Sequence, residues 1–260
     1  MKIEFPKLDT DLGRVKLPCQ VQPKYDGELA VWLPEQGVLT NRYGTEKVLP
    51  LCKELPNIEL VGELYWDTGK RNFYQALPKL KQHDPLLKFA VFGMYHTDMT
   101  FSEQMKILKL AIQNSDRVSV VEGHNAYSHP ELEHYLKDNL KQGWEGSVVK
   151  PLMSSSFTSW VKNKPDETID LLILGVSKKK SAIAVGTPDG KILGHCSLLG
   201  QPEIAALVGK ENIIGDTKED YLISPSYAIE VKHLGVIEPS GCLRNPRISR
   251  LREDLGKDNL

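Results

Sequence analysis

A lysine beside a carboxylate and a turn-forming glycine, in Gln22-Pro23-Lys24-Tyr25-Asp26-Gly27, is the stretch of this sequence that could do chemistry. It lies between two apolar runs. The amine of Lys24 could attack a phosphate or a carbonyl carbon if neighbours or desolvation lowered its pKa enough to remove its proton. A lysine before a turn is more often a solvated surface residue, so the other charged residues of the chain must decide between the two.

Two acids lie within or beside apolar runs. Glu63 falls inside the apolar segment 62–65. A buried carboxylate there would need a cation or hydrogen-bond donors, whereas an outward-facing one would need neither. Glu145 begins the apolar run 145–150, which ends in Lys150. An acid in that place is usually a solvated loop residue, so neither acid identifies a site alone.

Cations occur in three further places. Lys162 and Lys164 are two residues apart, so in a strand they would lie on one face. Like charges this close repel unless they share an anion, and phosphate is the natural one; an exposed edge strand is the alternative. Arg42 could clamp a phosphate or simply be a surface residue. The run 243–254 carries four arginines interleaved with isoleucine and leucine, which favours a docked segment over a solvated tail.

Strands and helices alternate in the part of the chain that carries most of these residues. Two helices are predicted from capping boxes, in which Thr100 and Ser128 each precede a glutamate by three residues. Gly143 is placed to end the second helix, and a third helix is predicted at about 72–80. Apolar runs rich in β-branched and aromatic residues predict strands at 29–33, 38–41, 58–65, 88–95, 147–150 and 159–162.

A polar stretch with a proline, residues 163–167, predicts a domain boundary. Beyond it the apolar runs are shorter, and one short helix is predicted at 202–208. Five or so short strands with one small helix are typical of a small β-barrel. We therefore predict an α+β chain with domains over residues 1–165 and 166–260. The strands of the second domain are predicted at 171–176, 182–185, 191–197 and 227–234.

The composition is that of a globular protein, with 40% hydrophobic and 26% charged residues among 260. A formal net charge of −1 gives no overall basic field, so any nucleic acid must be bound by a local basic patch. The four cysteines have no metal-ligand spacing and are expected to be reduced. No apolar run is long enough to span a bilayer. We expect a monomer in the cytoplasm, or inside an infected cell if a phage encodes it.

Taken in chain order, these clusters resemble the ATP-dependent DNA ligases of the covalent nucleotidyltransferase superfamily. The residues Lys24-Tyr25-Asp26-Gly27 are similar to the family's adenylation motif, Lys-x-Asp-Gly. Segments 62–65, 89–92, 145–150 and 162–164 follow in the family's order, and 243–254 is similar to its arginine-rich last motif. Each motif is short, but together they cover nearly the whole chain.

The resemblance implies a nucleotidyltransferase (adenylation) domain, with antiparallel sheets and flanking helices, followed by an OB-fold β-barrel. It implies that Lys24 attacks the α-phosphate of ATP, that AMP passes to the 5′-phosphate at a nick in double-stranded DNA, and that the 3′-hydroxyl then displaces it. Lys162 and Lys164 would lower the pKa of Lys24 and bind phosphate charge in the transition state.

The resemblance also implies roles for the remaining motif residues. Glu63 would hold the ribose, Phe92 would stack on adenine, and Gln22 would contact the nucleotide. Arg42 would contact the AMP phosphate or the nick phosphate, and Glu145 would help to place Mg²⁺, whose preferred ligands are hard oxygens and substrate phosphates. The residues expected to orient the pyrophosphate are Arg252 and Asp254.

Three positions depart from the family's pattern: Leu29 and Leu255 replace common cations, and Gly93 replaces an acid after the stacking phenylalanine. None of them touches Lys24, so we expect the chain to be active. Few residues precede Lys24, so we expect a minimal ligase without the DNA-encircling domain of larger relatives, acting in DNA repair or replication. The alternatives are an RNA ligase or an mRNA-capping guanylyltransferase with the same lysine chemistry, or a non-catalytic OB-fold protein that binds nucleic acid.

Overall fold

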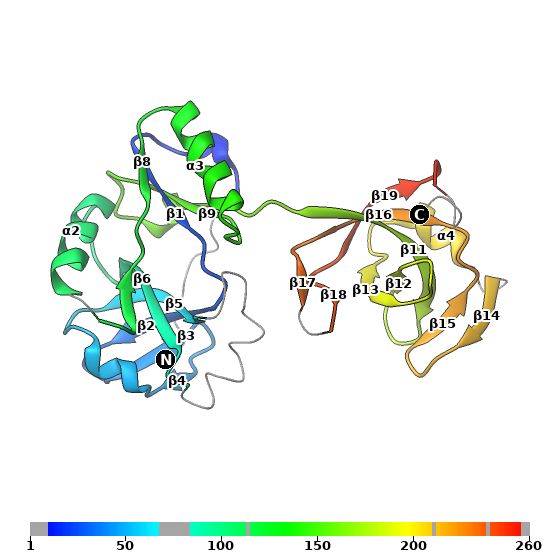
Figure 1. Ribbon diagram of the computed structural model, residues 1–260, viewed down its shortest axis with the longest axis horizontal. Coiled ribbons are helices and arrows are strands. Elements are labelled where there is room, and N and C mark those ends of the chain that lie inside the picture. The colour runs from blue at the N-terminus through cyan, green and yellow to red at the C-terminus, as the bar shows by residue number, and fades with distance from the viewer. Residues whose placement is uncertain (1–9, 68–83, 113–114, 210–211, 238–239, 256–260) are drawn as a thin grey trace. The chain divides into compact units, whose positions relative to one another are not determined.

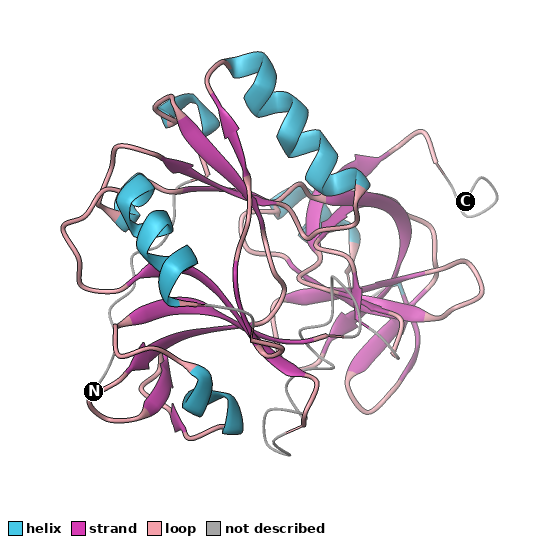
Figure 2. Ribbon diagram, turned by 60° about the vertical axis from the view of Figure 1, so that its left-hand side comes forward, coloured by secondary structure: helices cyan, strands magenta, loops and turns pink. Residues whose placement is uncertain are grey.

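The chain divides into two compact units, Met1–Lys164 and Pro165–Leu260. Each has its own hydrophobic core, and strands outweigh helices in both (Figures 1 and 2). The helix predicted at about 72–80 lies outside the residues that the structure describes. The computed structural model describes residues 10–67, 84–112, 115–209, 212–237 and 240–255.

The first unit contains two sheets. In both sheets all neighbouring strands run antiparallel except β6 and β7, which are parallel. The six-stranded sheet has the order β4 (Glu46–Lys47), β3 (Val38–Asn41), β2 (Glu28–Leu33), β5 (Leu60–Trp66), β6 (Leu87–Met94), β7 (Val118–Val120). The four-stranded sheet has the order β10 (Val161–Asn163), β9 (Ser147–Pro151), β1 (Cys19–Pro23), β8 (His124–Ala126).

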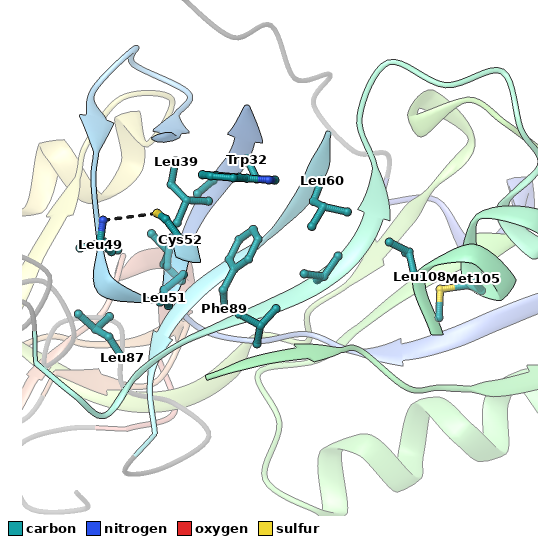
Figure 3. Close-up of a cluster of buried hydrophobic side chains, with 14 of the residues drawn as sticks. Trp32, Leu39, Leu49, Leu51, Cys52, Leu60, Leu87, Phe89, Met105 and Leu108 are labelled. Carbon is teal, nitrogen blue, oxygen red and sulfur yellow. Dashed lines mark hydrogen bonds between the residues drawn. The ribbon is translucent and has the colours of Figure 1, made fainter. Parts of the chain in front are cut away.

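The largest core of this unit lies on one face of the six-stranded sheet (Figure 3). Trp32, Leu60 and Phe89 come from three of its strands, and Met105 and Leu108 pack against them from α2 (Phe101–Ala111). The strands are close together at Gly62, where a Cβ atom would lie 2.5 Å from the carbonyl oxygen of Ala90. Only glycine fits this approach, so the spacing of β5 and β6 depends on it.

The two predicted helix starts are confirmed. The Thr100 side chain accepts from the Glu103 N–H at the start of α2, and the Thr100 N–H donates to the Glu103 carboxylate. Ser128 and Glu131 make the same pair of bonds at the start of α3 (His129–Lys141). Gly143 has φ +83° just after α3, which is the backbone conformation that ends a helix at glycine. Leu132 and Leu136 of α3 pack on the four-stranded sheet.

Most predicted strands of the first unit are also confirmed, with ends that differ by one or two residues. The exception is the strand predicted at 159–162. Phe157–Ser159 forms a 3-10 turn, capped by the Ser156 side chain, and β10 begins only at Val161. Trp160 is directed into the large core instead of continuing the strand.

The second unit is built on a seven-stranded sheet, which is more than the five or so strands expected. Its central strand, β11 (Glu167–Ser177), pairs with three neighbours. The predicted strands and short helix are found, but β14, β15 and β19 had not been predicted as separate strands. The further elements are β12 (Ala182–Gly186), β13 (Ile192–Ser197), α4 (Pro202–Leu207), β14 (Ile213–Asp216), β15 (Asp220–Ile223), β16 (Ala228–His233), β17 (Val236–Ile237), β18 (Cys242–Leu243) and β19 (Arg247–Arg252).

The arginine-rich segment is docked, as its interleaved apolar residues predicted. β19 pairs with β16, and Ile248 and Leu251 pack against the core of the second unit. Among the described residues, no helix is long and apolar enough to cross a membrane.

Candidate active site

Lys24 lies at the turn that leads from β1 into β2. Its backbone N–H donates to the carbonyl oxygen of Gly146 at 3.0 Å, which fixes the turn against the segment that precedes β9. Its side chain is 26% exposed, and its Nζ donates to a carboxylate oxygen of Glu145. The nucleophile expected from the sequence is therefore partly open to solvent and hydrogen-bonded to a second motif residue.

Glu145 bridges two lysines. One carboxylate oxygen accepts from Lys24 and the other accepts from Lys164, while only 4% of the residue is exposed. A close backbone approach makes this possible, because a Cβ atom on Gly146 would lie 2.1 Å from the carbonyl oxygen of Asn163. Glycine at 146 thus allows the start of β9 and the end of β10 to bring Glu145 and Lys164 together.

Glu63 joins the same cluster from β5. Its Oε1 accepts from the backbone N–H of Gly27 at 3.2 Å. A Cβ atom on Gly27 would lie 2.2 Å from the carbonyl oxygen of Leu64, so glycine is required for this contact. Burial, together with the nearby negative charges of Glu145 and Asp26, raises the pKa of Glu63 to about 7, against the opposing effect of Lys24. We call Lys24, Glu63, Glu145 and Lys164 the Lys24 cluster.

The charge balance in this cluster corrects one expectation. Burial alone would lower the pKa of Lys24, but Glu145, Glu63 and Asp26 outweigh it, and the pKa of the amine is raised. The positive charge of Lys164 does not reverse the raised pKa of Lys24, because Glu145 is hydrogen-bonded to both lysines. The pKa of Glu145 itself is lowered, since the attraction of the two cations exceeds the effect of burial. The prediction that the motif lysines depress the pKa of Lys24 is wrong for this arrangement.

Gln22 and Phe92 are linked by a residue that the sequence analysis had not assigned to the site, Lys150. The Nζ of Lys150 donates to Gln22 Oε1 at 2.5 Å and to the carbonyl oxygen of Phe92 at 2.7 Å. Lys150 ends the run that Glu145 begins, which was the only signal for it in the sequence. The contacts of Lys150 with Gln22 and Phe92, which are distant in sequence, become evident only in the structure.

Three aromatic rings beside the Lys24 cluster were also missed. Tyr25 lies with its ring centroid 4.8 Å from that of Tyr65 and 4.8 Å from that of Trp144. Two of the rings adjoin a cluster residue in sequence, since Tyr25 follows Lys24 and Trp144 precedes Glu145. That adjacency is a signal the sequence did offer.

The other predicted site residues are not joined to the Lys24 cluster by any contact that the described residues make. Arg42 is exposed on the turn after β3, and Lys162 is half-buried on β10; neither forms an ion pair with a described residue. Arg252 and Asp254, in the second unit, pair with each other at 2.7 and 2.8 Å, and Arg252 also pairs with Asp170 at 2.5 Å. These contacts raise the pKa of Arg252 and lower that of Asp254 to about 2.

Among the described residues, no group of three or more histidine, cysteine, aspartate or glutamate side chains is placed to hold a metal ion. Magnesium commonly binds through one or two carboxylates together with substrate phosphates. Glu145 offers one carboxylate of this kind, although both of its oxygens are engaged by lysines. Glu145 could therefore serve a magnesium ion that arrives with a nucleotide only after one of the two lysines releases its oxygen.

No family model matches the chain, and no curated protein matches it by sequence. Solved structures do. A Lig E DNA ligase, described in a study of DNA binding with a minimal scaffold, aligns with a TM-score of 0.72 at 18% identity, covering 96% of this chain and 100% of that one. This chain has the fold of a DNA ligase.

Two other ligases share the fold with lower scores. The ATP-dependent DNA ligase of bacteriophage T7, solved with ATP, gives a TM-score of 0.52 at 15% identity, covering 95% of this chain and 98% of that one. The Chlorella virus DNA ligase-adenylate gives 0.51 at 16% identity, covering 94% and 97%. The family resemblance read from the motifs is thus confirmed as a shared fold along nearly the whole chain.

Proposed function

We propose that the protein is an ATP-dependent DNA ligase that seals nicks in double-stranded DNA, with a nucleotidyltransferase domain followed by an OB-fold domain. One observation carries the proposal: in a chain with the ligase fold, Glu63, Glu145 and Lys164 come from three separate segments and meet at Lys24. This is the set of residues that phosphoryl transfer to an amine would use.

In the first step, the Nζ of Lys24 attacks the α-phosphorus of ATP. An N–P bond forms, the bond to the bridging oxygen of pyrophosphate breaks, and the amine loses its proton. The pairing of Lys24 with Glu145 must loosen before attack, because only the neutral amine is nucleophilic. Lys164 and Lys162 would then bind the phosphate charge. Magnesium, when bound at Glu145 and the phosphates, would neutralise part of that charge.

The second and third steps move AMP through the DNA. An oxygen of the 5′-phosphate at the nick attacks the AMP phosphorus, the N–P bond breaks, and Lys24 recovers its proton. The 3′-hydroxyl then attacks the 5′-phosphorus, so that a phosphodiester forms and AMP leaves. Arg42 would contact the AMP or nick phosphate, Glu63 the ribose, and Phe92 the adenine. Gln22, Arg252 and Asp254 remain proposed contacts for ATP and its pyrophosphate.

The test is incubation of the protein with α-labelled ATP and Mg²⁺ after pretreatment with pyrophosphate, followed by denaturing electrophoresis. Wild type should retain label, and Lys24→Ala should retain none. Lys137→Ala, which removes an exposed lysine on α3, is the matched control and should label like wild type. If pretreated wild type takes up no label, the ligase proposal fails and binding of nucleic acid without catalysis becomes the better hypothesis.

Nucleotide and substrate choice separate the alternatives that use the same lysine. Labelling by GTP in place of ATP would assign the protein to capping enzymes. Faster sealing of nicked RNA than of nicked DNA would assign it to RNA ligases. The DNA ligase proposal expects ATP as the donor and nicked DNA as the better substrate, measured with otherwise identical duplexes.

A further inference from the structure

Lys150 is a lysine with almost no access to solvent. It lies on β9 with 1% of its surface exposed. Its Nζ is surrounded by the rings of Trp160, Phe92 and Phe101, whose centroids lie at 3.8, 4.6 and 4.9 Å. We call these four residues the Lys150 cage. Only the two oxygens of Gln22 and Phe92 offer the amine conventional hydrogen bonds among the described residues.

Stability alone does not explain an amine in this place. Removing an ammonium from water is costly, and burial lowers the pKa of Lys150 well below its usual range. Two hydrogen bonds and three ring faces offset part of that cost. An apolar side chain of similar volume would fill the same space without any such cost, and replacements of this kind are often neutral or stabilising.

The amine of Lys150 connects the two sheets of the first unit at Gln22 and Phe92, which are both proposed site residues. Lys150 and Gln22 lie on neighbouring strands of the four-stranded sheet, whereas Phe92 lies on β6 of the six-stranded sheet. Gln22 is two residues before Lys24. The Nζ thus connects β1, the strand that precedes the proposed nucleophile, to β6, the strand that carries the proposed adenine-stacking ring.

A second series of hydrogen bonds also connects Gln22 to the strand of Phe92. Gln22 Nε2 donates to the carbonyl oxygen of Val121 at 2.8 Å, and the N–H of Val121 donates to the carbonyl oxygen of Val91 at 2.7 Å. Val91 is the neighbour of Phe92 on β6. Gln22 and Phe92 are therefore held on two sides of one closed set of hydrogen bonds, with Lys150 as its only charged or ionisable member.

We propose that Lys150 is a positioning residue for adenylation: its amine fixes the strand and ring of Phe92 relative to β1, the strand directly before Lys24, without touching the nucleotide phosphates. This rests on the proposed ligase function. A small displacement of a reacting group can lower a rate by about 100-fold, so loss of the tie should slow the transfer of AMP to Lys24 by about that factor.

The experiment is single-turnover formation of lysyl-AMP in the full chain, with saturating α-labelled ATP. Lys150→Met removes both hydrogen bonds at similar volume. We expect its rate to fall by about 100-fold while the final amount of labelled protein stays at the wild-type level. A merely structural role would instead lower the final amount, because less protein would be folded, and would leave the rate of the folded fraction unchanged.

Two further variants complete the design. Lys88→Met makes the same substitution on β6, where among the described residues it removes an ion pair with Asp67 at 2.7 Å, and should keep the wild-type rate. Lys150→Gln retains N–H donors without the charge and should lie between wild type and Lys150→Met. If Lys150→Met does not fold, Lys150→Gln replaces it in the test. The same two quantities are then compared with wild type: the rate of lysyl-AMP formation and the final amount of labelled protein.

The outcomes separate this inference from the function on which it rests. Absence of label in pretreated wild type overturns the ligase proposal itself. Label in wild type together with a wild-type rate in Lys150→Met overturns the positioning role alone. A slowed rate with full final labelling supports both.

Discussion

The Lys24 cluster and the Lys150 cage each hold the lysine after which they are named by hydrogen bonds, yet the pKa values of these two lysines are shifted in opposite directions. Around Lys24 the acceptor is a carboxylate with further acids nearby, and the pKa is raised despite burial. Around Lys150 the acceptors are an amide and a carbonyl oxygen, the neighbours are aromatic rings, and the pKa is lowered. The two lysines thus differ in the formal negative charge around the amine, which favours its protonated form at Lys24 and is missing among the described groups that contact Lys150.

The difference suggests a division of labour. Under the proposed function, the Lys24 cluster would keep a cation at the site, where an anionic substrate would replace the carboxylate as its partner. The Lys150 cage excludes charge and solvent, so its amine can only hold its neighbours in place. Four changes would break or sharpen this contrast.

Replacing Glu145 by glutamine should have the largest effect on activity. It removes the charge that pairs with both Lys24 and Lys164, along with the proposed magnesium ligand, while retaining an oxygen acceptor. We expect lysyl-AMP formation to slow by about 100-fold or more. The rate of labelling from ATP measures this, and Glu133→Gln, an exposed member of an ion pair on α3, should change nothing. A near-normal rate would mean that the Lys24 cluster does not depend on its central carboxylate.

Replacing Gly27 by alanine should break the geometry of the Lys24 cluster by steric means. The new Cβ atom would approach the carbonyl oxygen of Leu64 to 2.2 Å and displace the N–H that binds Glu63. We expect a loss of about 1–3 kcal/mol in the free energy of unfolding, measured in urea. The matched control is Gly215→Ala, where a Cβ atom meets nothing within 4 Å. Equal stability of the two variants would contradict the close approach at Gly27.

The Lys150 cage should make stability rise with pH. Because the pKa of Lys150 is lowered in the folded state, the unfolded chain binds more protons between that pKa and the usual lysine value of about 10.4. Its contribution to the free energy of unfolding therefore increases across that window, by at most about 1.4 kcal/mol per pH unit. Urea unfolding at pH 7 and 9 should show this rise in wild type and lose it in Lys150→Met. Parallel pH profiles would contradict it.

Glu63 should give a smaller effect of the opposite sign. Its pKa of about 7 lies above the usual value for a glutamate, so the folded state binds more protons between about 4.3 and 7. Stability from this group is therefore lost as pH rises through that window. Glu63→Gln keeps an acceptor for the Gly27 N–H and should be stabilised relative to wild type at pH 8 but not at pH 4. A constant difference between the two proteins would reject the raised pKa.

The sequence allowed the scaffold of the site to be predicted because its signals are local. The capping boxes at Thr100 and Ser128 and the apolar runs of β2, β3, β5 and β6 depend on residues a few positions apart. The strands β14 and β19 were not predicted because they lack such a local signal. Ile213 and Ile214 of β14 are exposed, and β19 is rich in arginine, so neither shows a buried alternating face.

Four residues of the candidate site could be indicated from the sequence, but their electrostatics could not. The order of short motifs indicated Lys24, Glu63, Glu145 and Lys164. That Glu145 gives one oxygen to each lysine, and so raises the pKa of Lys24, depends on distances that no spacing encodes. Lys150 is the clearest case, because a lysine at the end of a strand is usually exposed and only distant partners bury it.

Lys164 is both a member of the Lys24 cluster and the last residue of the first unit. Its side chain and that of Lys24 bind the same carboxylate, so the ionisation of the nucleophile and the freedom of the chain where it leaves the unit are thermodynamically linked. Such linkage is reciprocal. Whatever competes for Glu145 loosens that exit, and whatever restrains the exit changes the affinity of Lys24 for its proton.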